Sequence, residues 1–170
     1  MEKQHFLKRL NDITCFVFDV DGVFTNNQLI ASEEGDLLRS FNAKDGFALK
    51  TAIEKNMQVC IITGGTSTAV HKRFELLGVQ HNYYRVTNKV KVLNDFLNQQ
   101  NILPENVLYL GDDIPDYEAM LLCGLKCCPN DAVAEIQSIA DFICVQKGGD
   151  ACVREVIEMV LKVQGKWFIF

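Results

Sequence analysis

The chain has 170 residues, of which 48% are hydrophobic and 23% charged, and this composition is typical of one globular domain with a substantial core. The net charge of −5 and the lack of a Lys/Arg cluster argue against a nucleic-acid-binding surface, and no apolar run approaches the roughly 20 residues that span a bilayer. The N-terminal segment lacks a signal-peptide core, and the seven cysteines stand mostly among apolar residues, so we expect reduced thiols and a cytoplasmic protein.

Short apolar runs alternate with helical patterns along the chain. The runs predict strands at 15–19, 58–62, 81–84, 107–110, 125–128 and 142–145. Helices are expected at 46–55, 66–77, 89–100, 114–122, 132–139 and 151–163. Short strands that alternate with helices indicate a parallel sheet covered by helices on both faces. The predicted fold class is therefore α/β and Rossmann-like.

One segment interrupts this alternation. Residues 24–42 contain two short β-like runs around "SEEGD", which predicts a β-hairpin inserted after the first strand. No linker, repeat or low-complexity segment divides the chain, so residues 1–170 are expected to form a single domain. The apolar tail at about 165–170, "GKWFIF", would be a liability on a free monomer and suggests an interface.

Polar residues follow four of the predicted strands, at the edge of the sheet where ligands bind in folds of this class. The first example along the chain is "CFVFDVDGVFT", in which an apolar run typical of a buried strand is followed by two aspartates one residue apart. In chain order, the four sets are Asp19 and Asp21; Thr63, Gly64 and Gly65; Lys89; and Asp112, Asp113 and Asp116.

Several carboxylates in one pocket require a cation among them, because two charges 4 Å apart repel by about 4 kcal/mol at an effective dielectric of 20. Oxygen ligands suit a hard cation such as Mg²⁺, which also accepts phosphate oxygens. Thr63 and the backbone amides of the two glycines could hold a phosphate group, and Lys89 would offset its charge. This set predicts phosphoryl transfer, in which Asp19 attacks phosphorus and Asp21 protonates the leaving oxygen and later activates water.

The segments "DVDGVFT", "IITGGTS", "NK" and "YLGDDIPD", in this order, resemble the four motifs of the haloacid dehalogenase phosphatase superfamily. The resemblance covers nearly the whole chain. It implies Asp19 as the nucleophile, with an aspartyl-phosphate intermediate, and Asp21 as the general acid and base. It also implies that Mg²⁺ is held by Asp19, Asp112 and the backbone carbonyl of Asp21. Thr63, Gly64 and Lys89 would bind the phosphoryl group, and Asp113 and Asp116 would help to position the metal or Lys89 without contacting the phosphoryl group themselves.

The spacing of the motifs leaves no room for the cap domain that many members of this superfamily carry. Only 43 residues lie between Asp19 and Thr63, and 25 between Thr63 and Lys89. "FNAKDG", "GGDACVRE" and "QGKWFIF" resemble the tetrameric branch that acts on 3-deoxy-D-manno-octulosonate 8-phosphate, a lipopolysaccharide precursor. This branch implies a homotetramer in which a neighbour's C-terminal tail closes the site. A small-molecule sugar-acid phosphate would then contact the residues Thr25, Lys44, Asp45, Gly65 and Arg154.

Two departures from that branch affect the expected substrate. Many members carry a basic residue where this chain has Gly65, and a branch glycine is replaced by Ala151. A nine-carbon keto-sugar acid 9-phosphate is therefore the nearest alternative substrate. Two further classes stay open, a phosphorylatable receiver domain and a catalytically inactive scaffold, and repeated turnover would distinguish the enzyme from both. Lys44 and Asp45 could also simply begin a helix, and Arg154 could be a solvated charge.

Overall fold

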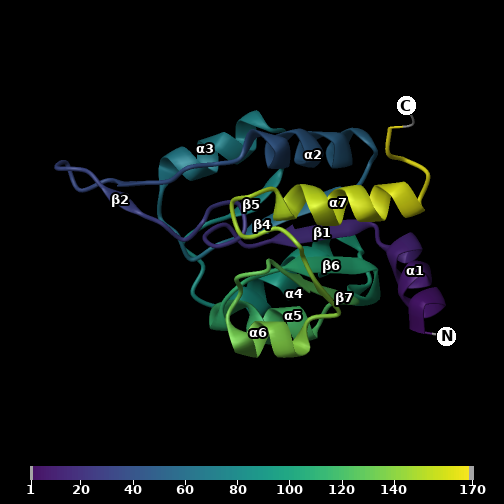
Figure 1. Cartoon of the computed structure of the whole chain (residues 1–170). Helices are drawn as coiled ribbons and strands as arrows, with labels where there is room; N and C mark the ends of the chain where they lie inside the picture. The colour runs from purple at the N-terminus through teal and green to yellow at the C-terminus, as the bar shows by residue number, and fades with distance from the viewer. Residues whose placement is uncertain (1, 169–170) are drawn as a thin grey trace.

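Six parallel strands form the central sheet of the molecule, and the computed structural model describes residues 2–168 of it (Figure 1). The sheet order is β5-β4-β1-β6-β7-β8, so that β1 pairs on one side with β4 and on the other with β6. The strands are β1 (Cys15–Phe18), β4 (Gln58–Ile62), β5 (His81–Tyr83), β6 (Val107–Leu110), β7 (Leu125–Cys128) and β8 (Phe142–Ile143). All six lie where the sequence predicted strands, with ends that differ by at most two residues.

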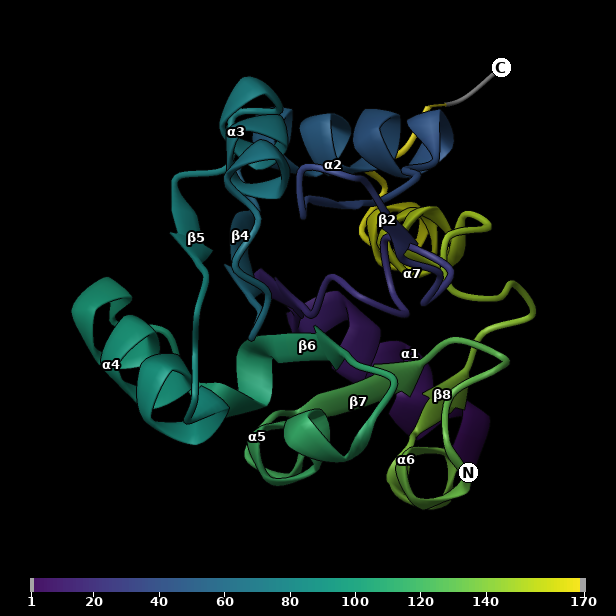
Figure 2. The same ribbon diagram turned by 90° about the vertical axis from the view of Figure 1, so that its left-hand side faces the viewer.

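Helices cover both faces of this sheet (Figures 1 and 2). One face carries α1 (Glu2–Asp12), α2 (Ala43–Glu54), α3 (Thr68–Leu76) and α7 (Cys152–Val163). The other carries α4 (Lys89–Gln100), α5 (Tyr117–Leu121) and α6 (Ala134–Ile139), with the short 3₁₀ turns η1 (Pro104–Asn106) and η2 (Ile114–Asp116) before β6 and α5. The predicted Rossmann-like α/β class is confirmed. The helix α1 was not predicted, although its segment is amphipathic.

The side chains of β1 show why this sequence forms a central strand. Phe16 and Phe18 belong to the apolar cluster under α2, α3 and α7, whereas Cys15 and Val17 belong to the cluster under α4, α5 and α6. All four residues are fully buried. Successive side chains of a strand point to opposite faces of the sheet, so a strand that is apolar throughout is stable where both faces are covered. This sequence is therefore suited to the middle of a parallel sheet that has helices on both faces.

The predicted hairpin follows β1 and projects away from the sheet (Figure 1). Its strands β2 (Ile30–Ala31) and β3 (Leu37–Leu38) pair antiparallel with each other and not with the main sheet. The turn between them contains Gly35 at a φ of 89°, a left-handed conformation that glycine adopts without steric cost. No cap domain lies between β1 and α2 in this part of the described chain.

The described part of the C-terminal tail lies against its own chain, and its predicted role at an interface stays a prediction. Trp167 is 8% exposed and packs on its own chain, where its ring lies 6.4 Å from that of Phe47. The guanidinium of Arg154 lies over the same indole at 5.5 Å. Residues 169 and 170 of the predicted interface tail lie outside the described residues.

The cysteines agree with the expectation of reduced thiols. All seven cysteines are free and buried, as predicted for reduced thiols that fill the core. Among residues 2–168, none of the helices combines the length and the apolar character that a membrane span requires.

Candidate active site

The carboxyl ends of β1, β4 and β6 and the start of α4 enclose a cavity of about 470 Å³. The parallel order of these strands places their ends at one edge, as the sequence predicted. The predicted residues that line this acidic pocket are Asp19, Asp21, Thr63, Gly64, Gly65, Lys89, Asp112 and Asp113. The remaining lining residues are Asn27, Val86, Thr87 and Pro115.

Asp19 directly follows β1 and is held between a buried strand and a buried cation. Its backbone N–H donates to the carbonyl of Leu110 at 3.1 Å, which extends the pairing of β1 with β6 by one residue. Lys89 Nζ lies 2.9 Å from Asp19 Oδ1. Burial raises the pKa of Asp19 from 3.8 to about 7, the Asp116 carboxylate adds to the rise, and Lys89 opposes it. The site therefore favours positive charge next to this carboxyl group.

Lys89 is the first residue of α4, and its ammonium joins two carboxylates. It lies 2.7 Å from Asp116 Oδ1 as well as 2.9 Å from Asp19. Burial alone would lower the pKa of Lys89, but the two carboxylates outweigh it and raise the pKa. The lysine is thus held charged within the pocket. Asn88 caps the helix by accepting the backbone N–H of Lys91 at 2.8 Å, which fixes where α4 begins.

Asp116 lies behind the pocket and contacts it only through other residues. It has no exposed surface, and it accepts hydrogen bonds from Lys89 and from Tyr109 Oη, each at 2.7 Å. The backbone N–H of Asp112 also donates to it at 3.3 Å. Gly111 makes room for this carboxylate, because a Cβ there would lie 2.6 Å from Asp116 Cγ. Asp113, in contrast, is exposed and caps η2 by accepting the N–H of Ile114 at 2.7 Å.

Asp112 lines the pocket and has one carboxylate oxygen without a hydrogen-bond donor among the described residues. Its Oδ2 accepts from Asn27 Nδ2 at 2.9 Å, but its Oδ1 is buried and has no hydrogen-bond partner among residues 2–168. Burial is the main reason that its pKa rises from 3.8 to about 6, although the Asn27 hydrogen bond opposes the rise. Gly22, at a φ of 81°, lets the loop approach, since a Cβ at this position would collide with the Asp112 carboxylate. A buried oxygen without a donor fits a bound cation.

The same region forms a cluster that could hold a metal ion. Asp19, Asp112 and Asp116 each offer one oxygen, and the three oxygens lie within 4.8 Å of one another. Asp116 already accepts from three donors, so the free coordinating capacity lies with Asp19 and Asp112. Carboxylate oxygens are the ligands of a hard divalent cation, and they leave room for further oxygen ligands from a phosphate.

Asp21 is paired with a residue that the sequence analysis did not single out. Arg39, which follows β3, donates from Nε to Asp21 Oδ1 at 2.6 Å and from Nη2 to Oδ2 at 3.0 Å. The hydrogen bond with Asp21 raises the pKa of Arg39, so this arginine is firmly charged. Nothing in "DLLRSFN" marked Arg39, because its position depends on how the hairpin returns to the sheet. The contact of Asn27 with Asp112 was missed for the same reason.

Thr63 directly follows β4 and lines the acidic pocket. Its side chain is largely buried, and its Oγ1 accepts the backbone N–H of Gly65 at 3.1 Å. The helix α3 begins only at Thr68, after Ser67 caps it, so the glycine loop is longer than predicted. Gly65 stands beside Thr63 and Asp21 without a side chain of its own.

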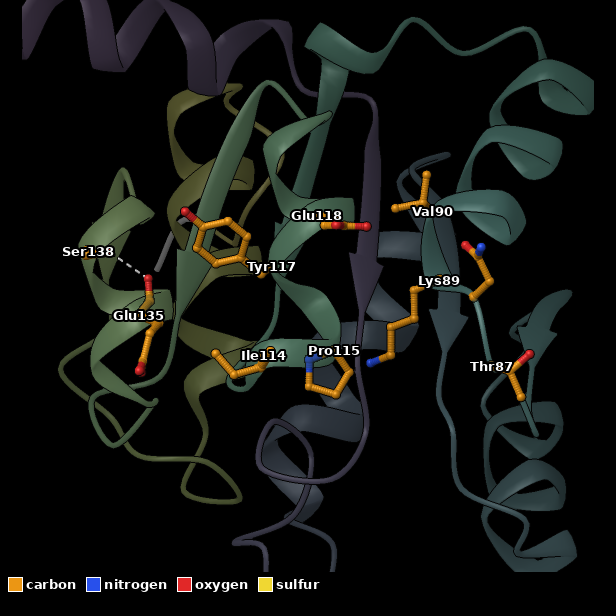
Figure 3. Close-up of a pocket in the computed structure, with 10 residues that line it drawn as sticks. Thr87, Lys89, Val90, Ile114, Pro115, Tyr117, Glu118, Glu135 and Ser138 are labelled. Carbon is orange, nitrogen blue, oxygen red and sulfur yellow. Dashed lines mark hydrogen bonds between the residues drawn. The ribbon is translucent and has the colours of Figure 1, made fainter.

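A second cavity of about 610 Å³ adjoins the acidic pocket (Figure 3). The two share Thr87, Lys89 and Pro115, and Figure 3 shows the Lys89 side chain extending toward Pro115. The far wall carries the aromatic ring of Tyr117 together with Glu135. The acidic pocket therefore opens on this side into a wider, partly apolar groove.

Four of the predicted substrate contacts do not line the acidic pocket. Thr25 is fully buried and supports the loop, where its Oγ1 accepts the N–H of Gly22 at 3.3 Å and donates to Asp21 at 3.5 Å. Asp45 is fully buried and accepts the backbone N–H of Arg154 at 2.8 Å, so it joins α2 to α7. Both residues are buried away from the lining of the acidic pocket, and their predicted contact with substrate stays a prediction.

Lys44 and Arg154 line a different cavity, of about 890 Å³, along α7. Arg154 pairs with Glu158 at 3.1 Å and lies over the rings of Phe47 and Trp167. Lys44 is exposed in the first turn of α2. Within one chain, neither side chain lines the acidic pocket.

Comparisons with a family model and with known proteins point to the same family. A sequence model of the haloacid dehalogenase-like hydrolases matches residues 83–156. The 3-deoxy-D-manno-octulosonate 8-phosphate phosphatase KdsC of Salmonella typhi is 35% identical over 162 residues, which cover 95% of this chain and 86% of the relative. The KdsC protein of Escherichia coli K12 is 34% identical over 94% of this chain and 85% of its own length.

A solved structure supports the same relationship. The 3-deoxy-D-manno-octulosonate 8-phosphate phosphatase of Moraxella catarrhalis, in complex with a magnesium ion, a phosphate ion and a KDO molecule, superposes with a TM-score of 0.92 at 29% identity. The match covers 95% of this chain and 93% of that one. The motifs, the fold and this degree of identity show that the chain belongs to the haloacid dehalogenase-like hydrolases, in the family of the 3-deoxy-D-manno-octulosonate 8-phosphate phosphatases.

Proposed function

We propose that this protein is a Mg²⁺-dependent phosphatase that hydrolyses 3-deoxy-D-manno-octulosonate 8-phosphate to the free sugar acid and phosphate, a step of lipopolysaccharide precursor synthesis. The observation that carries the proposal is the acidic pocket itself. Asp19, Thr63, Lys89 and Asp112 come from four separate segments and line one cavity, in which an oxygen of Asp112 is buried and unpartnered. The relatives that cover nearly the whole chain carry the name of this activity.

The metal would be held by the side chains of Asp19 and Asp112 and by the backbone carbonyl of Asp21. The free oxygen of Asp112 and the clustering of the carboxylates support this assignment. When bound, Mg²⁺ neutralises charge on the phosphate and on the carboxylates around it. The magnesium-bound relative supports the choice of ion.

The first chemical step belongs to Asp19. Its carboxylate oxygen attacks phosphorus and the ester bond to the sugar oxygen breaks, which leaves an aspartyl-phosphate and a sugar hydroxyl group. Asp21 donates the proton that the leaving oxygen needs. Lys89 lies 2.9 Å from Asp19, where it counters the negative charge that the phosphate adds, and Thr63 donates its hydroxyl hydrogen to a phosphate oxygen.

The second step returns the enzyme to its starting state. Asp21, now deprotonated, takes a proton from a water molecule, whose oxygen attacks phosphorus and breaks the bond to Asp19. Phosphate leaves, and Asp21 is again protonated for the next cycle. Asp116 acts through Lys89, because the hydrogen bond at 2.7 Å fixes the ammonium in the pocket. Asp113 acts at the rim, where it caps η2 and so fixes the loop after β6.

A nine-carbon keto-sugar acid 9-phosphate is the second candidate substrate, and one observation favours it. Gly65 leaves the wall of the pocket beside Asp21 without a side chain, so that a longer sugar acid has room there. The chemistry at phosphorus would be unchanged.

The assembly is proposed as a homotetramer in the cytoplasm. The hairpin supports an interface, since Ile30 is 64% and Leu38 52% exposed on a segment that projects from the sheet. A neighbour's C-terminal tail would close the acidic pocket and bring further substrate contacts to it, including Lys44 or Arg154 across the interface. Seven free cysteines agree with a reducing compartment.

Steady-state phosphate release with Mg²⁺ tests the function. The substrates would be octulosonate 8-phosphate, nine-carbon keto-acid 9-phosphates and hexose phosphates, with Asp19→Asn as the inactive control. A tenfold lead in kcat/KM for the eight-carbon substrate, about 1.4 kcal/mol in the transition state, would support the assignment. A lead for a nine-carbon acid would transfer the assignment to the alternative. Substantial turnover by Asp19→Asn would contradict the nucleophile, and no turnover at all would contradict the enzyme.

A further inference from the structure

We propose that Arg39 selects for the carboxylate of the sugar acid by exchanging partners: it binds Asp21 in the free enzyme and the substrate carboxylate in the complex. This inference rests on the proposed phosphatase function and deepens it. It assigns a substrate-recognition residue within the chain, in the hairpin that follows β1. It also links recognition of the acid to the release of Asp21 for catalysis.

The geometry of the pair is that of a carboxylate-binding site. The Arg39 side chain is 7% exposed, and it grips both oxygens of Asp21, at 2.6 and 3.0 Å. Its remaining nitrogen, Nη1, donates to the backbone carbonyl of Leu37 at 2.9 Å, which orients the guanidinium group. A planar guanidinium with two parallel hydrogen bonds recognises a carboxylate specifically, whichever molecule carries it.

The guanidinium group lies behind Asp21 and beside Gly65, two residues that line the acidic pocket. A Cβ built at Gly65 would lie 3.7 Å from Arg39 Nη2 and 3.6 Å from Asp21 Oδ2, so the missing side chain leaves this ion pair open to the pocket. The Asp21 side chain is 31% exposed, whereas the arginine lies buried behind it. A carboxylate that enters beside Gly65 therefore meets the arginine by displacing Asp21.

The charges around the pocket favour this exchange. Lys89 is the one cation among the described residues that line the acidic pocket, and Asp19 and Asp116 already hold it. A sugar-acid phosphate brings a carboxylate in addition to its phosphate, and that carboxylate enters a pocket lined by aspartates. Arg39 is positioned to offset its charge. Because one bidentate carboxylate replaces another, the arginine keeps its hydrogen bonds during the exchange.

The exchange also explains how a pocket without a cap could reject common phosphate esters. An ester that lacks a carboxylate leaves Asp21 bound to Arg39, so that the leaving oxygen is not protonated efficiently. An ester with a carboxylate frees Asp21, which takes up a proton from solvent and can then protonate the leaving oxygen. Binding of the substrate carboxylate to Arg39 then raises kcat as well as lowering KM, because it releases Asp21 to act as the general acid.

Kinetics of Arg39→Met and Arg39→Lys with two substrates test the proposal. Octulosonate 8-phosphate carries the carboxylate, and p-nitrophenyl phosphate does not. Arg39→Met should lower kcat/KM for the sugar acid phosphate at least tenfold more than it lowers kcat/KM for p-nitrophenyl phosphate. Arg39→Lys should recover part of KM for the acid but not the full selectivity, because an ammonium binds one oxygen at a time. Arg9→Met is the matched control, since it removes an Arg–Asp pair at 3.0 Å with Asp141, before β8 at the opposite edge of the sheet.

Equal losses for both substrates in Arg39→Met would show a merely structural role and overturn the proposal, as would unchanged selectivity. Calorimetry separates this failure from failure of the proposed function, because it needs no turnover. Wild-type protein should bind the free octulosonate, and Arg39→Met should lose that binding at least tenfold while retaining inorganic phosphate with Mg²⁺. Equal octulosonate affinity in both proteins would overturn the role of Arg39 even if the wild type proved to be an active phosphatase.

Discussion

The buried carboxyl group of Asp45 provides a quantitative test of the contact between α2 and α7. Asp45 has no exposed surface, and its Oδ1 accepts the N–H of Arg154 at 2.8 Å. Its Oδ2 is buried and has no hydrogen-bond partner in the described part of the chain. Burial is the main cause that raises the pKa of Asp45 from 3.8 to about 6, and hydrogen bonds from the backbone of Arg154 and Ala151 oppose the rise.

A raised pKa means that the folded protein binds this proton more tightly than the unfolded chain does. The contribution of Asp45 to the free energy of unfolding is therefore fully present below about pH 4 and is lost as the pH rises through about 6. A difference of about two pKa units corresponds to about 3 kcal/mol. Asp45→Asn cannot ionise, so its free energy of unfolding relative to wild type should increase by about 2–3 kcal/mol between about pH 4 and pH 7.5.

Urea unfolding of both proteins at a series of pH values measures this difference. Any constant cost of the amide cancels, because only the change with pH is compared. Asp36→Asn is the control, since Asp36 is exposed between β2 and β3, outside the contact between α2 and α7, and should follow the wild-type pH curve within about 0.5 kcal/mol. Parallel curves for Asp45→Asn and wild type would refute the claim that burial of an ionised Asp45 destabilises the fold.

Further outcomes are expected at the site and at the interface. Chelation should abolish phosphate release and added Mg²⁺ should restore it, whereas activity that survives chelation would contradict the metal site. Gly22→Ala should lose most activity and about 1–3 kcal/mol of stability, because its φ is 81° and its Cβ would collide with Asp112. Gly35→Ala, at a φ of 89° with open space around it, is the control for strain alone and should keep full activity per folded molecule. Ile30→Lys should dissociate the proposed tetramer in sedimentation experiments, and an unchanged mass would exclude the hairpin interface. Deletion of residues 168–170, which keeps Trp167, should lower kcat/KM for the sugar phosphate more than for p-nitrophenyl phosphate, and equal losses would contradict closure by the tail.

The sequence predicted the strands and the strand-end residues because both follow from local rules. A short apolar run such as "CFVF", bounded by polar residues, favours a covered strand, and a parallel sheet puts the ends of its strands at one edge. Once β1, β4 and β6 were identified, Asp19, Thr63 and Asp112 had to converge. Lys89 was predicted as the first residue of its helix, and the structure has α4 begin there.

The remaining features depend on tertiary contacts that no local pattern encodes. Arg39 reaches Asp21 only because the hairpin returns beside β1. Asp45 occupies a helix start that could equally face solvent, and it is buried because α7 packs its first turn onto it. Trp167 is a residue type that is common at interfaces, and in this chain its ring contacts Phe47 and the guanidinium of Arg154. In each case the deciding partner lies far away in sequence.

The central position of β1 has a consequence for how the protein opens. Its backbone is paired on both sides and its side chains are fully buried, whereas the hairpin pairs only with itself and the tail is held by a few rings. Amide protons of β1 should therefore exchange with solvent only through global unfolding, while those of the hairpin exchange through local openings. Molecules with an open hairpin would still keep Asp19 and Lys89 in place. As the protein is gradually destabilised, it should therefore lose its selectivity for the sugar acid phosphate before it loses the ability to hydrolyse phosphate esters.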